Sequence, residues 1–220
     1  MEFQRARSPE QAQQRREAIL QAARDLCAKE GPAEVTLGAL ARAVGLAKSN
    51  VLRYVESREE ALLALCAEGW VAWAAALERR LAGETGVGLL EVATALSTTL
   101  AEQPVLCQLL ALPLEHNVSA RSLKRFKLEV VRVVGELGAL LSRAVSDLSP
   151  EDGAEVVQAA AILAAGTWAQ AHPPPALLAV YEAEPGLQGS RVAFEPRLRQ
   201  LLVTQVTGVR TLRHLVRRKG

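Results

Sequence analysis

The sequence predicts an all-α fold, with a small N-terminal three-helix unit followed by a larger helical domain. Apolar residues recur at steps of three and four along most of the 220-residue chain, and no segment alternates like a half-buried strand. Glycines and prolines interrupt this pattern at intervals that fit helices. Half of the residues are hydrophobic, so a chain of this length can bury a sizeable core.

The first unit is defined by residues 36–58, TLGALARAVGLAKSNVLRYVESR, which predict two short helices joined by a tight turn. Thr36 is a favourable N-cap for the first helix. Gly45 supplies the left-handed backbone that ends it. The second helix begins near Ala47 or Lys48 and carries a polar and basic face. A short helix, a glycine turn and such a second helix form the helix-turn-helix pattern.

Capping residues, glycines and prolines divide the rest of the chain into helices. Ser149-Pro150-Glu151-Asp152 marks a helix start, because serine caps, proline suits the first position and acids favour the positive end. The prolines at 173–175 end that helix. An amphipathic stretch beginning at Ser119 keeps its apolar spacing as far as Leu148. The expected helices cover about 58–82, 89–101, 104–112, 119–148, 150–171, 176–183 and 195–215.

The charge of the chain is nearly balanced, with a formal net value of +2. Basic residues are instead concentrated locally. Positions 42–58 contain one acid, Glu56, and four basic residues: Arg42, Lys48, Arg53 and Arg58. Phosphate affinity depends on such local cations, so this small patch can suffice for nucleic acid.

Several functional classes are excluded by the motifs that the chain lacks. The three cysteines lie far apart without metal-ligand spacing, and each falls on an apolar stretch typical of a buried position. The histidines are scattered, and no phosphate-binding glycine loop or nucleophile elbow is present. We therefore expect no catalytic residues, no metal and no cofactor.

The N-terminus contains no apolar run, so no signal peptide is expected. The longest nearly apolar stretch, 156–171, is shorter than the ~20 residues that a membrane span needs. These two features predict a cytoplasmic protein without a membrane partner.

The helix-turn-helix and its flanks resemble the N-terminal domain of the TetR family of bacterial transcriptional regulators. The match covers roughly residues 14–62 and includes the lead-in helix RREAILQAARDLCAKEG, the AxxVGLAKSNV turn and the RYVESREEAL exit. Leu52 and Val55 stand where the family usually has aromatic residues, and Arg58 replaces the usual lysine. The resemblance implies a DNA-binding domain at 1–57, with the helix-turn-helix at about 36–55. An N-terminal arm at 1–14 precedes it, and its basic residues either reach the DNA or form a solvated tail. The resemblance also implies that residues 58–220 bind a ligand and dimerise.

Residues around the two-helix motif are the expected DNA contacts. The family match and their placement imply phosphate contacts for Thr36, Lys48, Tyr54 and Arg58. Ser49, Asn50 and Arg53 are expected nearest the base edges of double-stranded operator DNA.

The resemblance implies that the helix at 156–171 and the last helix pair with the same helices of a second copy in a homodimer. Small residues line one side of 156–171, and an aliphatic stripe follows the last helix. The expected interface residues are Ala160, Ala164, Leu198, Leu201, Leu202 and Val209. The alternative, that both stripes fill the core of a single chain, stays open.

The resemblance also implies an unknown small-molecule effector. Aromatic or polar residues on otherwise apolar helices are the candidate pocket residues: Trp70, Trp73, Cys107, Leu110, His116, Phe126 and Trp168. An ordinary core role is the alternative for each of them. Their character favours a mostly apolar ligand. The expected function is a repressor that binds a palindromic operator and is released by that ligand. The alternative is a DNA-binding regulator or architectural protein without an inducer.

Overall fold

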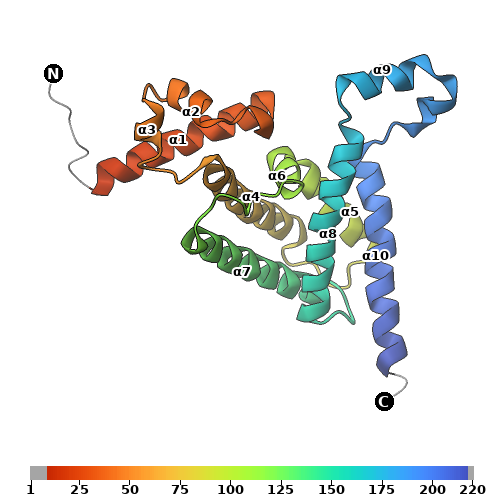
Figure 1. Cartoon of the computed structure of the whole chain (residues 1–220). Coiled ribbons are helices and arrows are strands. Elements are labelled where there is room, and N and C mark those ends of the chain that lie inside the picture. The colour runs from red at the N-terminus through yellow and green to blue at the C-terminus, as the bar shows by residue number, and fades with distance from the viewer. Residues whose placement is uncertain (1–8, 218–220) are drawn as a thin grey trace, which may run out of the picture.

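The computed structural model describes residues 9–217, and over this range it contains α-helices and two short 3-10 helices but no strand (Figure 1). The predicted all-α class is confirmed. The elements are α1 (Pro9–Glu30), η1 (Pro32–Glu34), α2 (Leu37–Ala43), α3 (Lys48–Val51), α4 (Arg58–Leu81), α5 (Leu89–Ala101), α6 (Pro104–Leu110), α7 (Ala120–Ala144), α8 (Pro150–Ala171), α9 (Pro175–Ala183), η2 (Pro185–Ser190) and α10 (Phe194–Arg217).

The first three helices form a small unit at one end of the molecule (Figure 1). Its core joins one face of α1 to the inner sides of α2 and α3 through fully or almost fully buried apolar side chains. They are Ile19, Leu20, Ala23, Cys27, Leu40, Ala41, Val51 and Val55. Burial of this apolar surface leaves the outer side of α3 facing solvent.

Local capping follows the sequence prediction closely. The Thr36 side chain accepts a hydrogen bond from the Ala39 amide at 3.1 Å, which satisfies one free donor at the start of α2. Gly45 has a φ of 65°, the left-handed value that lets the chain leave α2. Ser57 caps α4 by accepting from the Glu60 amide at 3.0 Å.

The helix α4 leads from the small unit into the centre of the larger domain and contacts α1, α5, α6 and α7. Leu62, Trp73 and Leu77 have no exposed surface. The helix is long and apolar enough to cross a membrane by composition, but 56% of its most apolar window is buried inside the protein. That burial identifies α4 as a core helix.

The larger domain is built on the packing of α7 against α8 and of α10 against α5 and α8. Figure 1 shows α8 and α10 side by side, at the edge of the molecule farthest from α1 to α3. The helix α9 and η2 form an arm that extends beyond them, and α9 has no buried residue.

The largest difference from the predicted helix ends is at the end of α7. The helix α7 stops at Ala144 instead of continuing to Leu148, and Asp147 has a φ of 68° in the connection to α8. Leu148 is nevertheless 6% exposed, so the loop carries this leucine into the core. Its carbonyl accepts a hydrogen bond from the Ser142 hydroxyl at 2.8 Å. Apolar spacing persists through the loop because burial, rather than helix, sets the pattern here.

All three cysteines are free and buried, as expected. Burial raises the pKa of the Cys27 thiol to about 11 and those of Cys66 and Cys107 to about 12. These thiols stay protonated at neutral pH and have the character of small apolar side chains.

Candidate functional site

The outer face of α3 and the following turn presents polar side chains that the fold does not use. Lys48, Ser49 and Arg53 are exposed, and Asn50 is half-buried. None of these four side chains forms a hydrogen bond or ion pair that involves another described residue. Their donors and acceptors are therefore available to an external partner, and Val51 anchors the same helix in the core.

Two cations gather beside the start of α2. A Cβ atom built on Gly38 would lie 3.0 Å from Lys48 Cε and 3.7 Å from Arg42 Nη1. Gly38 therefore leaves room for Lys48 to cross α2 next to Arg42. This places two positive charges near the N-terminus of a helix, where the free amides also favour anions.

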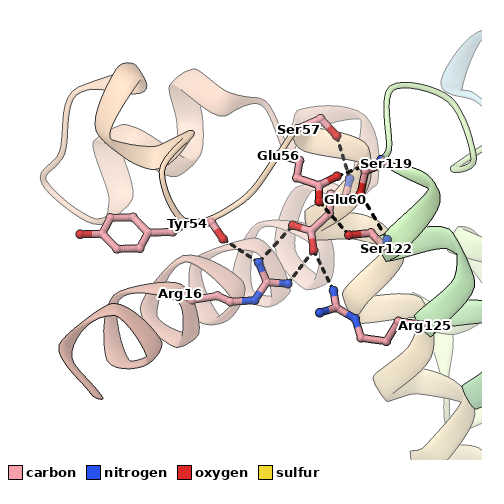
Figure 2. Close-up of polar contacts among 8 residues, drawn as sticks. All are labelled: Arg16, Tyr54, Glu56, Ser57, Glu60, Ser119, Ser122 and Arg125. Atoms are coloured by element: carbon pink, nitrogen blue, oxygen red, sulfur yellow. Dashed lines mark hydrogen bonds and ion pairs between the residues drawn. The ribbon is translucent and has the colours of Figure 1, made fainter. Parts of the chain in front are cut away.

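The other three expected contacts differ in their surroundings. Thr36 is exposed, and its hydroxyl donates to no described residue although its oxygen caps α2. The Tyr54 ring points away from the polar network in Figure 2. Arg58 instead donates from Nε to the Val35 carbonyl at 2.6 Å and from Nη2 to the Pro32 carbonyl at 2.7 Å. These bonds favour a structural role for Arg58 over the expected phosphate contact.

Part of the expected basic arm is helical. The helix α1 begins at Pro9, so residues 9–14 belong to it, and residues 1–8 lie outside the described range.

A polar network joins the small unit to the larger domain (Figure 2). Arg16 of α1 donates to the Tyr54 carbonyl at 2.6 Å and makes two bonds to the Glu60 carboxylate, at 2.6 and 3.1 Å. Arg125 of α7 donates at 3.2 Å to Glu60 Oε1, the oxygen that also accepts the 2.6 Å bond from Arg16. The Glu60 side chain is only 3% exposed, and these two guanidinium groups are its charged partners.

A second connection uses Glu56, which follows the helix-turn-helix. Its carboxylate accepts from the Ser119 amide at 2.9 Å, the Ser119 hydroxyl at 2.8 Å and the Ser122 hydroxyl at 2.9 Å. The Ser119 amide hydrogen bond is the main reason that the pKa of Glu56 lies below its usual value. Glu56 thus fixes the start of α7 to the end of the small unit.

Open grooves lie where α7 meets α4 and where it meets α8. We name the first the junction groove; it has a volume of about 600 Å³ and lies between Arg16 of α1, the α4 segment 60–75 and the α7 segment 122–129. The second, the α7–α8 groove, has a volume of about 520 Å³. Its lining carries no charged residue and consists of Trp70, Leu110, Val130, Val131, Val134, Gly135, Ala154, Gln158, Ala161 and Ile162.

The expected pocket residues do not converge on one cavity. Phe126 lines the junction groove, and Trp70 and Leu110 line the α7–α8 groove. Trp73 and Cys107 have no exposed surface and belong to the core. His116 is exposed in the loop before α7. Trp168 stacks on His172 at a centroid distance of 3.9 Å and contacts Phe194 edge-on at 5.0 Å.

Most of the expected dimer residues lie in the core of the single chain. Ala160, Ala164, Leu198 and Leu202 have no exposed surface, and Val209 is 8% exposed. A side chain that is already enclosed has no surface left for a second copy. Of the expected set only Leu201 is half-exposed.

Sequence reasoning missed the residues of the junction. Arg16 and Glu60 are 44 positions apart, and Glu60 stands where any helix favours an acid, in its first turn. Only the crossing of α1, α4 and α7 in space shows that these charges meet.

Comparisons with known proteins agree with this architecture. A family model described as "Bacterial regulatory proteins, tetR family" matches residues 19–65. A second, "Tetracyclin repressor-like, C-terminal domain", matches residues 67–213, which is more than half of the chain. No curated protein sequence shows significant similarity.

Solved structures of similar fold include the TetR family transcriptional regulator PfmR from Thermus thermophilus. Its identity is 18%, its TM-score is 0.51, and the match covers 86% of this chain and 97% of PfmR. The MbdR regulator from Azoarcus sp. CIB matches at 17% identity and a TM-score of 0.48, over 87% of this chain and 96% of MbdR. The helix-turn-helix, the helical body behind it and the two family models together show that this chain belongs to the TetR family of DNA-binding transcriptional regulators.

Proposed function

We propose that this protein is a cytoplasmic repressor that binds a palindromic operator as a homodimer and is released by a small, mostly apolar molecule. Residues 1–57 bind the DNA, and residues 58–220 hold the effector and dimerise. The observation that carries the proposal is the outer face of α3, whose polar side chains are exposed or half-buried and have no partner among the described residues. A recognition helix needs such a face to enter the major groove.

The roles of the individual residues follow from their positions. Lys48, Thr36 and Tyr54 contact phosphates, with Arg42 beside Lys48 adding to the local positive charge. Ser49, Asn50 and Arg53 read base edges, because amide and guanidinium groups can form paired hydrogen bonds with purines.

Salt dependence separates the two kinds of contact. Lys48→Ala should weaken binding to all DNA sequences and reduce the slope of log affinity against log salt by about one unit. Asn50→Ala and Arg53→Ala should instead change the selected sequence, at ~1–3 kcal/mol for each good base contact. Arg79→Ala is the control, since this exposed cation lies near the far end of α4. Unchanged sequence preference in both base-contact variants would refute the assignment.

The homodimer uses the outward faces of α8 and α10. Ile162 on α8 is 72% exposed, an unusual position for a large aliphatic side chain, and Leu201 on α10 is half-exposed. Binding of both subunits to one palindromic operator requires the two α3 helices of the dimer to lie one turn of DNA apart, ~34–36 Å. Ile162→Glu should give monomers in analytical ultracentrifugation and lose operator affinity. Ile162→Val, which keeps an apolar surface, should remain dimeric.

Effector response distinguishes a regulator of this kind from a DNA-binding protein without an inducer. Two grooves of several hundred Å³ have the size of ordinary ligand sites. A ligand can release DNA only by the difference in its affinity for the DNA-bound and free conformations. A compound that both raises thermal stability and releases operator DNA is the expected result. A screen in which every stabilising compound leaves operator affinity unchanged favours the protein without an inducer.

A further inference from the structure

We propose that the junction groove binds an amphipathic anion, a molecule with an alkyl chain and one anionic head group, and that Arg125 holds the head. Binding at this site follows from the groove itself. Its effect on DNA rests on the function proposed above.

The floor of the groove is apolar and shaped by small side chains. The α4 side contributes four alanines that leave space for a chain, and Phe126 closes the α7 side. Val71, a large aliphatic residue, is 42% exposed there. The apolar lining residues are Leu63, Ala64, Ala67, Val71, Ala72, Ala75 and Phe126. Such a surface gains free energy when an alkyl chain covers it.

The carboxylates of the groove are already occupied. Glu60 accepts from Arg16 and Arg125. Glu68 accepts two bonds from Arg24, and Glu129 accepts two from Arg132. A cationic head group would therefore compete with an existing arginine at every acid in the lining.

Arg125, in contrast to these occupied carboxylates, has N–H donors available for an anionic head group. Its side chain is 67% exposed and uses one nitrogen, Nη2, for its bond to Glu60. The remaining N–H groups of the guanidinium bond to no described residue, and a planar guanidinium can bind a carboxylate through two parallel hydrogen bonds.

Two more cations flank this position. Arg121 and Lys124 are exposed on α7 and form no ion pair within the described part of the chain. They line a shallow depression of about 450 Å³ that shares Arg125 and Glu129 with the junction groove. The apolar floor thus ends at a basic cluster, the arrangement that matches an alkyl chain with an anionic head.

The site also touches both parts of the protein. Arg125 and Arg16 donate to the same Glu60 oxygen, so an anion that draws Arg125 away removes one of the two charges that hold this buried carboxylate. The ligand would meet α1 of the DNA-binding domain as well as α4 and α7. Its affinity must therefore depend on how these helices are placed.

The test is calorimetric titration of the full-length protein with decanoate, kept below its micellar concentration. Decanoate should bind, and Arg125→Gln should weaken it roughly tenfold or more, as expected for a charge-assisted hydrogen bond. Arg143→Gln is the matched control, because it makes the same change on an exposed residue of α7 roughly 27 Å farther along the helix. Decanol and decyltrimethylammonium should bind more weakly than decanoate by a similar factor.

A second variant tests the chain-binding floor independently. Ala72 is exposed and lines the groove, so Ala72→Phe should fill it without disturbing the core and should weaken decanoate binding. Equal decanoate affinity in wild type and Arg125→Gln, or no binding at all, overturns the proposal. Decanol binding as tightly as decanoate also overturns it, since the uncharged α7–α8 groove would explain that result.

Operator binding is measured in the same samples. If the protein binds decanoate through Arg125 but binds no operator, the anion site is supported and the proposed function is refuted. If it binds its operator but does not bind decanoate, the proposed function is supported and the anion site is refuted.

Discussion

Gly138 of α7 and Gly153 of α8 pack backbone against backbone where the two helices cross. A Cβ atom on Gly138 would lie 2.5 Å from the Pro150 carbonyl oxygen and 2.7 Å from the Ala154 amide nitrogen. Backbone atoms cannot move aside as a flexible side chain can, so this crossing distance exists only because both positions lack a side chain.

We predict that Gly138→Ala destabilises the protein by about 2–3 kcal/mol, the cost of overpacking a close contact. Gly135→Ala, one turn earlier on α7, has open space around the added methyl and should be more stable by about 0.5–1 kcal/mol. Urea denaturation of the two variants checks the difference. Equal stabilities would mean that the helices separate at little cost.

These glycines show where prediction from sequence ends. Thr36, Gly45 and Ser149 could be assigned as caps or turns because their effects are local and act through the next few residues. Gly138 and Gly153 carry no local sign of their role, since the constraint comes from another helix.

The same limit applies to the stripe of small residues on α8 and the aliphatic stripe on α10, which were both expected at a dimer interface. Periodic small and aliphatic residues on α8 and α10 indicate that these faces are buried, and Ala164 and Leu198 are buried. Periodicity does not tell what covers a face. Sequence therefore could not separate the core of one chain from an interface between two. The exposed Ile162, which breaks the pattern, is the better sign of an external partner.

Trp70 and Trp73 provide a second matched pair. Their ring centroids are 5.4 Å apart, but only Trp73 has a bonded indole N–H, which donates to the Thr99 hydroxyl at 3.0 Å. The buried Trp70 N–H has no acceptor within residues 9–217. Trp73→Phe removes a satisfied buried hydrogen bond, whereas Trp70→Phe removes an unpaired donor.

We therefore expect Trp73→Phe to cost about 1–2 kcal/mol more than Trp70→Phe, because both lose similar ring area and only one loses a bond. Chemical denaturation followed by far-UV circular dichroism measures this without relying on tryptophan fluorescence. A larger loss for Trp70→Phe would show that its N–H does find a partner in solution.

The Glu60 carboxylate should be the most costly charge in the junction to remove. Glu60→Gln leaves Arg16 and Arg125 without their shared anion and should lower stability by about 2–3 kcal/mol. This is less than for a fully buried pair, because the Arg16 side chain is 21% exposed.

Glu59→Gln is the control for that change. Glu59 is the neighbouring acid, is 21% exposed and meets Arg58 at 3.4 Å, so its loss should cost under about 1 kcal/mol. Similar losses of stability in the two variants would show that the contact of Glu60 with Arg16 and Arg125 contributes no more than the Arg58–Glu59 pair.

Glu56 makes the contribution of the junction to protein stability depend on pH. Its folded-state pKa is lowered, so it stabilises the protein above the ordinary glutamate value of about 4.3, and this contribution is lost as pH falls through the folded value. Glu56→Gln should therefore be less stable than wild type at pH 7. The difference should shrink as the pH drops below about 4.

The cause of this shift can be separated by substitutions at Ser119. Ser119→Ala removes the hydroxyl donor but keeps the amide, whereas Ser119→Pro removes both. The φ of −66° at Ser119 is already the value that proline fixes, and this cap position needs no helical amide bond. Because the amide is the largest cause of the shift, the pKa of Glu56 should rise slightly in Ser119→Ala and clearly more in Ser119→Pro. Carboxyl titration by NMR measures both, with helix content checked by circular dichroism. If the two variants give the same Glu56 pKa, the hydroxyl rather than the backbone amide holds this carboxylate at the start of α7.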